Sequence, residues 1–110
     1  MPSTLISTRQ GWIEDPQTVL DAVQSALTES IGTPPKARHL RLVQFPADHF
    51  TSGEGEGERY TNIEVTLFSG RTVELKQALF AAVKRNLGAL GVPEKDVKII
   101  LIESPKENWS

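Results

Sequence analysis

The sequence repeats itself once, and this internal repeat limits the possible folds more than any other feature of the chain. Equivalent residues recur at a constant separation of 59 positions, without a gap, at Gly11 and Gly70, Leu20 and Leu79, Ala22 and Ala81, Gly32 and Gly91, Pro34 and Pro93, Lys36 and Lys95, Leu42 and Leu101, Pro46 and Pro105, and the aromatic Phe50 and Trp109. Such self-similarity indicates the duplication of one supersecondary unit. We expect one domain over residues 1–110, with a first repeat at 2–50 and a second at 61–109.

The first repeat has the pattern of a β-α-β unit. Residues 3–8 are rich in β-branched and hydroxyl side chains, which is typical of a strand. Asp15 and Pro16 then predict a helix start, with Asp15 as the N-cap and Pro16 at the first helical position. Apolar residues recur at helical spacing as far as Gly32, which is expected to end the helix. Residues 39–44 alternate in polarity and predict a second strand.

The second repeat restarts the same order of elements after an acidic, glycine-rich stretch at 51–59. That stretch contains no apolar residue and is expected to form a flexible, solvated loop. Residues 62–68 alternate as in a strand, Thr72 is placed to cap a helix, and Gly91 is expected to end it. Residues 97–103 are apolar on both faces, so we expect this last strand to lie in the middle of the sheet.

Two β-α-β units predict an α/β (α+β) fold with a four-stranded mixed sheet. Each crossover makes its own two strands parallel. Pairing of the two units through their first strands, about a pseudo-twofold axis, makes those two strands antiparallel. Both helices then lie on one face, and the bare face carries Val43, Phe68, Ile100 and Ile102. Because an apolar sheet face needs a partner, we expect an oligomer.

The composition excludes several classes of function. A formal net charge of -2 does not favour general binding to nucleic acid or to an anionic membrane. The chain has no cysteine, so disulfides, thiolate chemistry and iron–sulfur clusters are excluded. Two histidines without metal-binding spacing do not favour a metal site. Without a secretory pattern or a long apolar run, the expected location is the cytoplasm.

The chain begins Met1-Pro2 and runs directly into the first predicted strand. Methionine is usually removed when proline follows it, so we expect Pro2 to carry a free secondary amine. Burial and nearby positive charge disfavour the ammonium form of an amine and so lower its pKa. Such an amine acts as a base at cellular pH.

Two segments of the second repeat carry a resemblance to a known family. Residues 67–79 (LFSGRTVELKQAL) and 96–109 (DVKIILIESPKENW) resemble the strand–turn–helix and the closing strand with aromatic tail of the tautomerase superfamily. In size and layout the chain is similar to fused two-unit 4-oxalocrotonate tautomerase-like and malonate semialdehyde decarboxylase-like proteins. The resemblance implies a homotrimer, no cofactor, and catalysis by the N-terminal proline, here Pro2.

The predicted topology places Pro2 near the turn that follows residues 62–68. Arg71, just before a helix N-terminus, is expected to bind a substrate carboxylate and to lower the pKa of the Pro2 amine. Pro2 and Arg71 are therefore the predicted catalytic residues. The weaker candidates for substrate binding are His39, Arg41, Phe68, Ser69, Lys98 and Trp109. The second cationic group in relatives comes from the same or a neighbouring subunit.

The expected function is an isomerase that interconverts the keto and enol forms of a small 2-keto carboxylic acid. Pro2 acts as the general base, and Arg71 binds the carboxylate. A hydratase, decarboxylase or dehalogenase of the same superfamily is the alternative. The decarboxylase relatives carry an acidic residue where this chain has Ala37, and a second arginine where it has Ser69. A non-catalytic trimeric binding protein is the alternative outside the enzymes.

Overall fold

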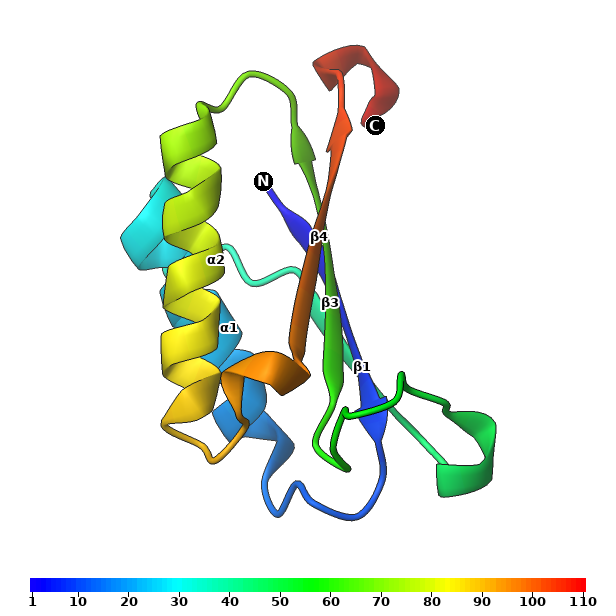
Figure 1. The fold of residues 1–110 in the computed structure, drawn as a ribbon. Coiled ribbons are helices and arrows are strands. Elements are labelled where there is room, and N and C mark those ends of the chain that lie inside the picture. The colour runs from blue at the N-terminus through cyan, green and yellow to red at the C-terminus, as the bar shows by residue number, and fades with distance from the viewer.

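The chain forms four strands and two long helices in the order that the repeat predicts. In the computed structural model, which describes residues 1–110, these are β1 (Ser3–Arg9), α1 (Pro16–Ile31), β2 (Leu40–Phe45), β3 (Thr61–Phe68), α2 (Val73–Gly88) and β4 (Val97–Ser104). Short 3-10 turns lie at η1 (Ala47–His49), η2 (Glu94–Asp96) and η3 (Lys106–Asn108). Figure 1 shows the two helices side by side on one face of the sheet, with the other face uncovered.

The strands are ordered β2-β1-β3-β4, as the pseudo-twofold arrangement predicts. The outer pairs β1–β2 and β3–β4 are parallel, and the central pair β1–β3 is antiparallel. In that central pair Leu5 lies opposite Glu64, its own counterpart in the repeat. The pseudo-twofold axis therefore passes between these two residues and relates one half of the sheet to the other.

The prediction that residues 97–103 form a central strand was wrong, because β4 lies at the edge of the sheet. One face of β4 packs on the core through Ile99 and Leu101. Its other face presents Ile100 and Ile102, which are 41% and 44% exposed. The apolar pattern on both faces thus reflects the uncovered face of the sheet and not a position between two strands.

Local sequence signals set the helix boundaries. The Asp15 carboxylate accepts a hydrogen bond from the Gln17 amide at 3.0 Å, and α1 ends at Gly32 with a φ of 74°. The Thr72 hydroxyl accepts a hydrogen bond from the Leu75 amide at 3.2 Å. These caps confirm the predictions from the sequence.

The second helix ends earlier than predicted. It closes at Gly88, and the chain passes through two further turn residues before it reaches Gly91, where φ is 91°. The Val92 amide donates back to the Leu87 carbonyl at 3.1 Å across this turn. Gly91 therefore reverses the chain, as a left-handed glycine does after a helix, but it lies beyond the last helical residue.

The core lies between the sheet and the two helices. Alternate residues of the two central strands point toward the helices and are fully buried, as the periodicity of strands requires. The central hydrophobic cluster is built from Ile6, Val19, Val23, Ala26, Leu27, Ile63, Val65, Leu67, Leu79, Ala82, Val83, Leu87, Val92 and Val97. Neither helix is long and apolar enough to pass through a lipid bilayer.

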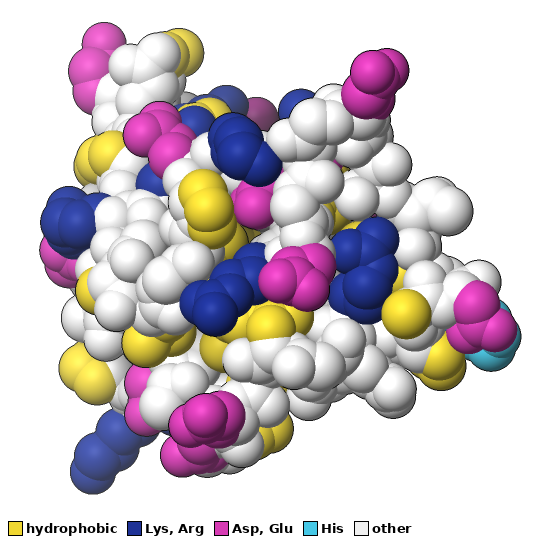
Figure 2. All heavy atoms as spheres, turned by 60° about the horizontal axis from the view of Figure 1, so that its bottom comes forward, with side chains coloured by type: hydrophobic (Ala, Val, Ile, Leu, Met, Phe, Trp, Pro, Cys, Tyr) yellow, Lys and Arg dark blue, Asp and Glu magenta, His cyan; other side chains and the backbone are white.

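The acidic segment at 51–59 forms a loop without regular secondary structure, as predicted, and hydrogen bonds tie it to η2, the turn between α2 and β4. The buried Asp96 carboxylate accepts a hydrogen bond from the Gly57 amide at 2.8 Å. The Lys95 ammonium donates to the Gly55 carbonyl at 2.8 Å. Figure 2 shows basic and acidic side chains interspersed over this end of the molecule.

Replacement of Asp96 by asparagine is expected to lower the free energy of unfolding at neutral pH by about 1 kcal/mol, because the bond from Gly57 loses its charged acceptor. The Gly57 amide, with a smaller contribution from Lys95, lowers the pKa of Asp96. The difference between wild type and Asp96→Asn should thus be complete above the ordinary aspartate pKa of about 3.9 and vanish as pH falls through the lowered value. Urea unfolding at several pH values measures this.

The matched control is Asp48→Asn, because the Asp48 side chain is 87% exposed and makes no contact to the loop. It should change stability by less than about 0.5 kcal/mol. Equal effects of the two substitutions would show that Asp96 does not anchor the loop.

Candidate active site

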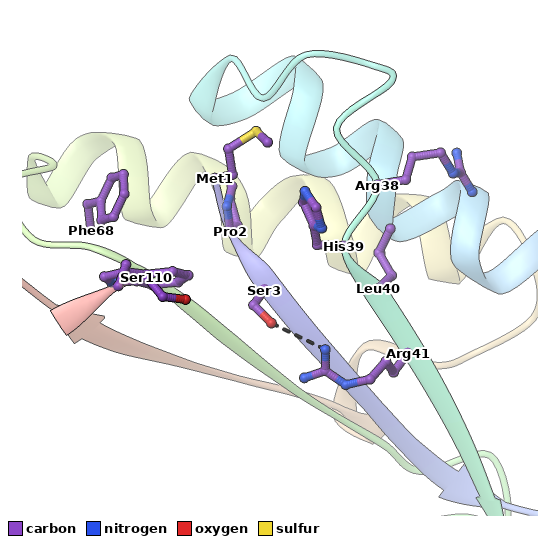
Figure 3. A pocket seen from close by; sticks show the side chains of 10 residues that line it. Met1, Pro2, Ser3, Arg38, His39, Leu40, Arg41, Phe68 and Ser110 are labelled. Atoms are coloured by element: carbon purple, nitrogen blue, oxygen red, sulfur yellow. Dashed lines mark hydrogen bonds between the residues drawn. The ribbon is translucent and has the colours of Figure 1, made fainter. Parts of the chain in front are cut away.

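A cavity of about 480 Å³ lies at the end of the sheet where β1 begins. Its size falls within the range that is usual for sites that bind small molecules. Figure 3 shows the start of β1 at its centre, with Phe68 on one side and His39 and Arg41 on the other. The lining residues are Met1, Pro2, Ser3, Arg38, His39, Leu40, Arg41, Phe68, Trp109 and Ser110.

Pro2 is buried in the wall of this cavity, whereas Met1 is 55% exposed. With Met1 in place, the Pro2 nitrogen belongs to a peptide bond and has no basicity. Removal of Met1 would convert that nitrogen to a secondary amine that borders the cavity. The geometry thus provides a position for a partly desolvated amine base, subject to that one processing step.

His39 enters the cavity from the segment that leads into β2. The Thr4 amide donates a hydrogen bond to the His39 carbonyl at 2.8 Å, which extends the parallel pairing of β1 and β2 by one step. This bond fixes the backbone of His39 next to the first residues of β1. Its imidazole makes no hydrogen bond or ion pair within the chain and is free to meet a ligand.

Two arginines line the same side of the cavity, but their charges are not equally available. Arg38 forms an ion pair with Asp21 at 2.7 Å. Arg41 donates to the Ser3 hydroxyl at 3.3 Å and has no acidic partner. Since a hydroxyl does not neutralise a guanidinium, Arg41 is the stronger candidate to attract an anion.

The opposite side of the cavity is aromatic. The Phe68 and Trp109 rings pack edge to face, with centroids 5.1 Å apart and planes at 74°. The Trp109 indole also donates to the Ser104 carbonyl at 3.4 Å. This pair supplies an apolar wall facing the cationic side, an arrangement that suits an organic acid.

Three residues predicted from the sequence do not line the cavity. The Arg71 guanidinium donates to the Phe68 carbonyl at 3.1 Å and is not among the residues that line the cavity. The Lys76 ammonium chiefly, and the Arg71 guanidinium to a smaller extent, lower the pKa of Glu103. Ser69 is exposed in the turn, and Lys98 lies on β4 opposite Asn62. Their roles in a site therefore stay predictions.

The sequence did not single out Ser3 or Arg38 as site residues, although both line the cavity. Serine is common in strands, so the type of residue 3 carries no signal. Arg38 lies in a short basic stretch with Lys36, and the sequence does not show which of these side chains faces the cavity. The adjacency of Arg38 to His39 was the one available signal.

Nowhere in the chain do three or more His, Asp or Glu side chains gather in a way that could hold a metal ion.

The pseudo-symmetric corner of the sheet differs from the Pro2 corner. Thr61, the repeat counterpart of Pro2, is fully buried and lines none of the cavities. It lies opposite Thr8, whose hydroxyl accepts a hydrogen bond from the Trp12 indole at 3.0 Å. The Arg59 guanidinium lies over the Trp12 ring at 5.7 Å. Side chains thus fill the corner that the duplication would have made equivalent.

Comparison with known proteins gives the family. Residues 37–110 match the family model described as tautomerase enzyme. Over 48 aligned residues the chain is 40% identical to the probable tautomerase RSp0893 of Ralstonia nicotianae. The aligned region covers 43% of this chain and 69% of that protein.

Solved structures of similar proteins cover nearly the whole chain. The structure of FG41 malonate semialdehyde decarboxylase inhibited by 3-bromopropiolate has a TM-score of 0.88 at 28% identity, over 98% of this chain and 87% of that one. The symmetric trimer of the Q0 fused 4-OT has a TM-score of 0.82 at 31% identity, over 94% and 85% of the two chains. The match to the family model, which spans more than half of the sequence, and the common fold together show that this chain belongs to the tautomerase family.

Proposed function

We propose that this chain is a tautomerase that needs no cofactor and that interconverts the keto and enol forms of a small 2-keto carboxylic acid. The observation that carries the proposal is the position of Pro2, buried in the wall of a cavity that is cationic on one side and aromatic on the other. Membership of the tautomerase family supports the same class of reaction.

The proposed reaction begins with Met1 removed and the Pro2 amine neutral. In the direction from enol to ketone, the amine takes the proton of the enol hydroxyl and the O–H bond breaks. The resulting ammonium returns that proton to the neighbouring carbon as the carbonyl forms, so that base and charge are restored at the end of the cycle. Burial of Pro2 and the positive charge of Arg41 both favour the neutral amine between turnovers.

The substrate carboxylate needs a cationic partner, and two arginines are candidates. Arg41 lines the cavity and has no acidic partner, which supports it as the group that binds the carboxylate in this protomer. Arg71, the residue that the sequence favours, donates a hydrogen bond to the Phe68 carbonyl and does not line the cavity. In our proposal Arg41 binds the carboxylate, and Arg71 fixes the strand end that carries Phe68.

Decarboxylation or hydration of a related acid is the second candidate function. It is favoured by the structural similarity to a malonate semialdehyde decarboxylase at 28% identity. Against it, the cavity is lined by no aspartate or glutamate that could activate water or orient a second carboxylate. We therefore rank tautomerisation first.

We further propose that three copies assemble through the bare face of the sheet. That face exposes Val43, Ile100 and Ile102 at 40%, 41% and 44%. Exposed apolar side chains on both edge strands of an uncovered sheet face favour an interface with other copies. Three related structures, including the symmetric trimer of the Q0 fused 4-OT, are trimers by their descriptions.

Replacing Pro2 by alanine is expected to reduce kcat/KM for the ketonisation of phenylenolpyruvate by about 100-fold or more, the usual contribution of a general base. Ultraviolet absorbance follows the reaction, on protein whose intact mass shows that Met1 is absent. Pro35→Ala, in the exposed segment after α1, is the matched control and should behave as wild type. An N-terminal alanine still carries a primary amine, so some turnover can remain, but turnover at the wild-type rate in Pro2→Ala would contradict the role of the Pro2 nitrogen.

Replacing Ile102 by glutamate is expected to dissociate the assembly, because a buried unpaired carboxylate at an interface is strongly unfavourable. Sedimentation should show wild type as three 12.1-kDa chains and the variant as a smaller species. Leu75→Glu on α2 is the control, since Leu75 is 40% exposed on a different element. A monomeric wild type would contradict the proposed trimer.

A further inference from the structure

We propose that His39 is a second acid–base residue of the Pro2 cavity, acting at the substrate oxygen while Pro2 acts at the carbon. This inference rests on the proposed function and changes one step of it: the proton transfer at the oxygen is assigned to His39 in place of Pro2. The two residues lie at the starts of neighbouring parallel strands and line one cavity. Figure 3 shows His39 beside Pro2, on the side of β1 that faces β2.

The backbone of His39 is fixed next to the start of β1. The Thr4 amide, two residues after Pro2, donates a hydrogen bond to the His39 carbonyl at 2.8 Å. Catalysis requires such fixed placement, because a loosely held group loses much of its effect. His39 is therefore held by the sheet itself, although its side chain is exposed to the cavity.

The side chain of His39 is also chemically available. The imidazole of His39 has no hydrogen-bond or ion-pair partner within the chain, whereas Arg38 is paired with Asp21 and Arg41 contacts Ser3. Imidazole is the side chain that ordinarily gains and loses a proton around neutral pH. Among the side chains that line the cavity, that of His39 is the only imidazole.

In the direction from ketone to enol, the proposed reaction has two proton transfers, one at the carbon and one at the oxygen. The neutral Pro2 amine takes a proton from the carbon next to the carbonyl, so that the C–H bond breaks and the C=C bond forms. The His39 imidazolium gives a proton to the carbonyl oxygen, so that its N–H bond breaks and the O–H bond forms. Solvent then carries one proton from the Pro2 ammonium to the neutral imidazole. Ketonisation of an enol is the reverse of these steps: the imidazole takes the O–H proton, and the Pro2 ammonium gives a proton to the carbon.

This division of labour removes a geometric demand on Pro2. A single base must reach the oxygen and the carbon in turn, whereas two groups on neighbouring strands reach one atom each. The repeat counterpart of His39 is Lys98 on β4, which carries an amine in place of the imidazole. The histidine is thus specific to the corner that contains Pro2.

The test uses His39→Ala and His39→Gln, with phenylenolpyruvate as substrate and protein that lacks Met1. Both variants should lose about 100-fold in kcat with KM changed by less than about threefold, because proton transfer and not binding is removed. Added 4-methylimidazole should restore turnover to His39→Ala, since it can occupy the vacated space. His49→Gln alters the other histidine, which is exposed on η1, and should match wild type.

A glutamine variant that retains the kcat of wild type would overturn the proposal, because glutamine can donate a hydrogen bond but cannot transfer a proton. Failure of 4-methylimidazole to restore His39→Ala would overturn it as well. Either result, together with loss of turnover in Pro2→Ala, would leave the proposed function intact. Turnover that does not depend on Pro2 would instead contradict the proposed function.

Discussion

The antiparallel pairing of β1 with β3 is the interaction on which the rest of this structure depends. It places Leu5 opposite Glu64 and so defines the pseudo-twofold axis that joins the two repeats into one sheet. Continuing this register by two residues beyond Ser3 brings Met1 opposite Phe68. A shift of β1 by one residue would turn Ile6 from the core to the bare face, and the same shift of β3 would turn Ile63. The hydrophobic core thus fixes the register, and the register forms the cavity.

The duplication produced two corners, and only one of them can hold a basic amine. The first corner has Pro2, His39, Arg41 and Phe68 where the second has Thr61, Lys98, Ile100 and Arg9. In the second corner the Arg9 guanidinium lies over the Phe50 ring at 5.0 Å, in the position where Phe68 meets Trp109 in the first. The same backbone framework therefore supports a filled, structural corner and an open one. Because of this asymmetry, we expect one active site in each protomer.

Much of the fold could be predicted because short-range signals agreed with the repeat. The starts of both helices are set locally, by Asp15 and Pro16 for α1 and by Thr72 for α2. The capping hydrogen bonds join residues only two or three positions apart, so the sequence pattern alone predicts them. The position of β4 in the sheet could not be predicted in the same way. A strand that is apolar on both faces fits a central position, but it equally fits an edge strand whose outer face is uncovered. The end of α2 was missed because Gly88 and Gly91 both suit a helix end.

The candidate site was predictable in part. Strand order and register bring Pro2, His39, Arg41, Phe68 and Trp109 to one cavity, and both follow from the repeat. Strand order and register do not determine the direction of the Arg71 side chain. That direction depends on a local hydrogen bond to the Phe68 carbonyl. The pairing of Arg38 with Asp21 likewise joins residues 17 positions apart through a contact that no local pattern predicts.

The central claim is that the Pro2 nitrogen is a neutral amine at the pH of the cell. A direct measurement is a nitrogen NMR titration of protein labelled with ¹⁵N-proline, on material whose intact mass shows that Met1 is absent. The reference is the free peptide of residues 2–5, which carries the same N-terminal proline in water. We predict that the nitrogen in the folded protein loses its proton at a lower pH than the nitrogen of the peptide. A titration midpoint in the folded protein that equals or exceeds that of the peptide would contradict the proposal.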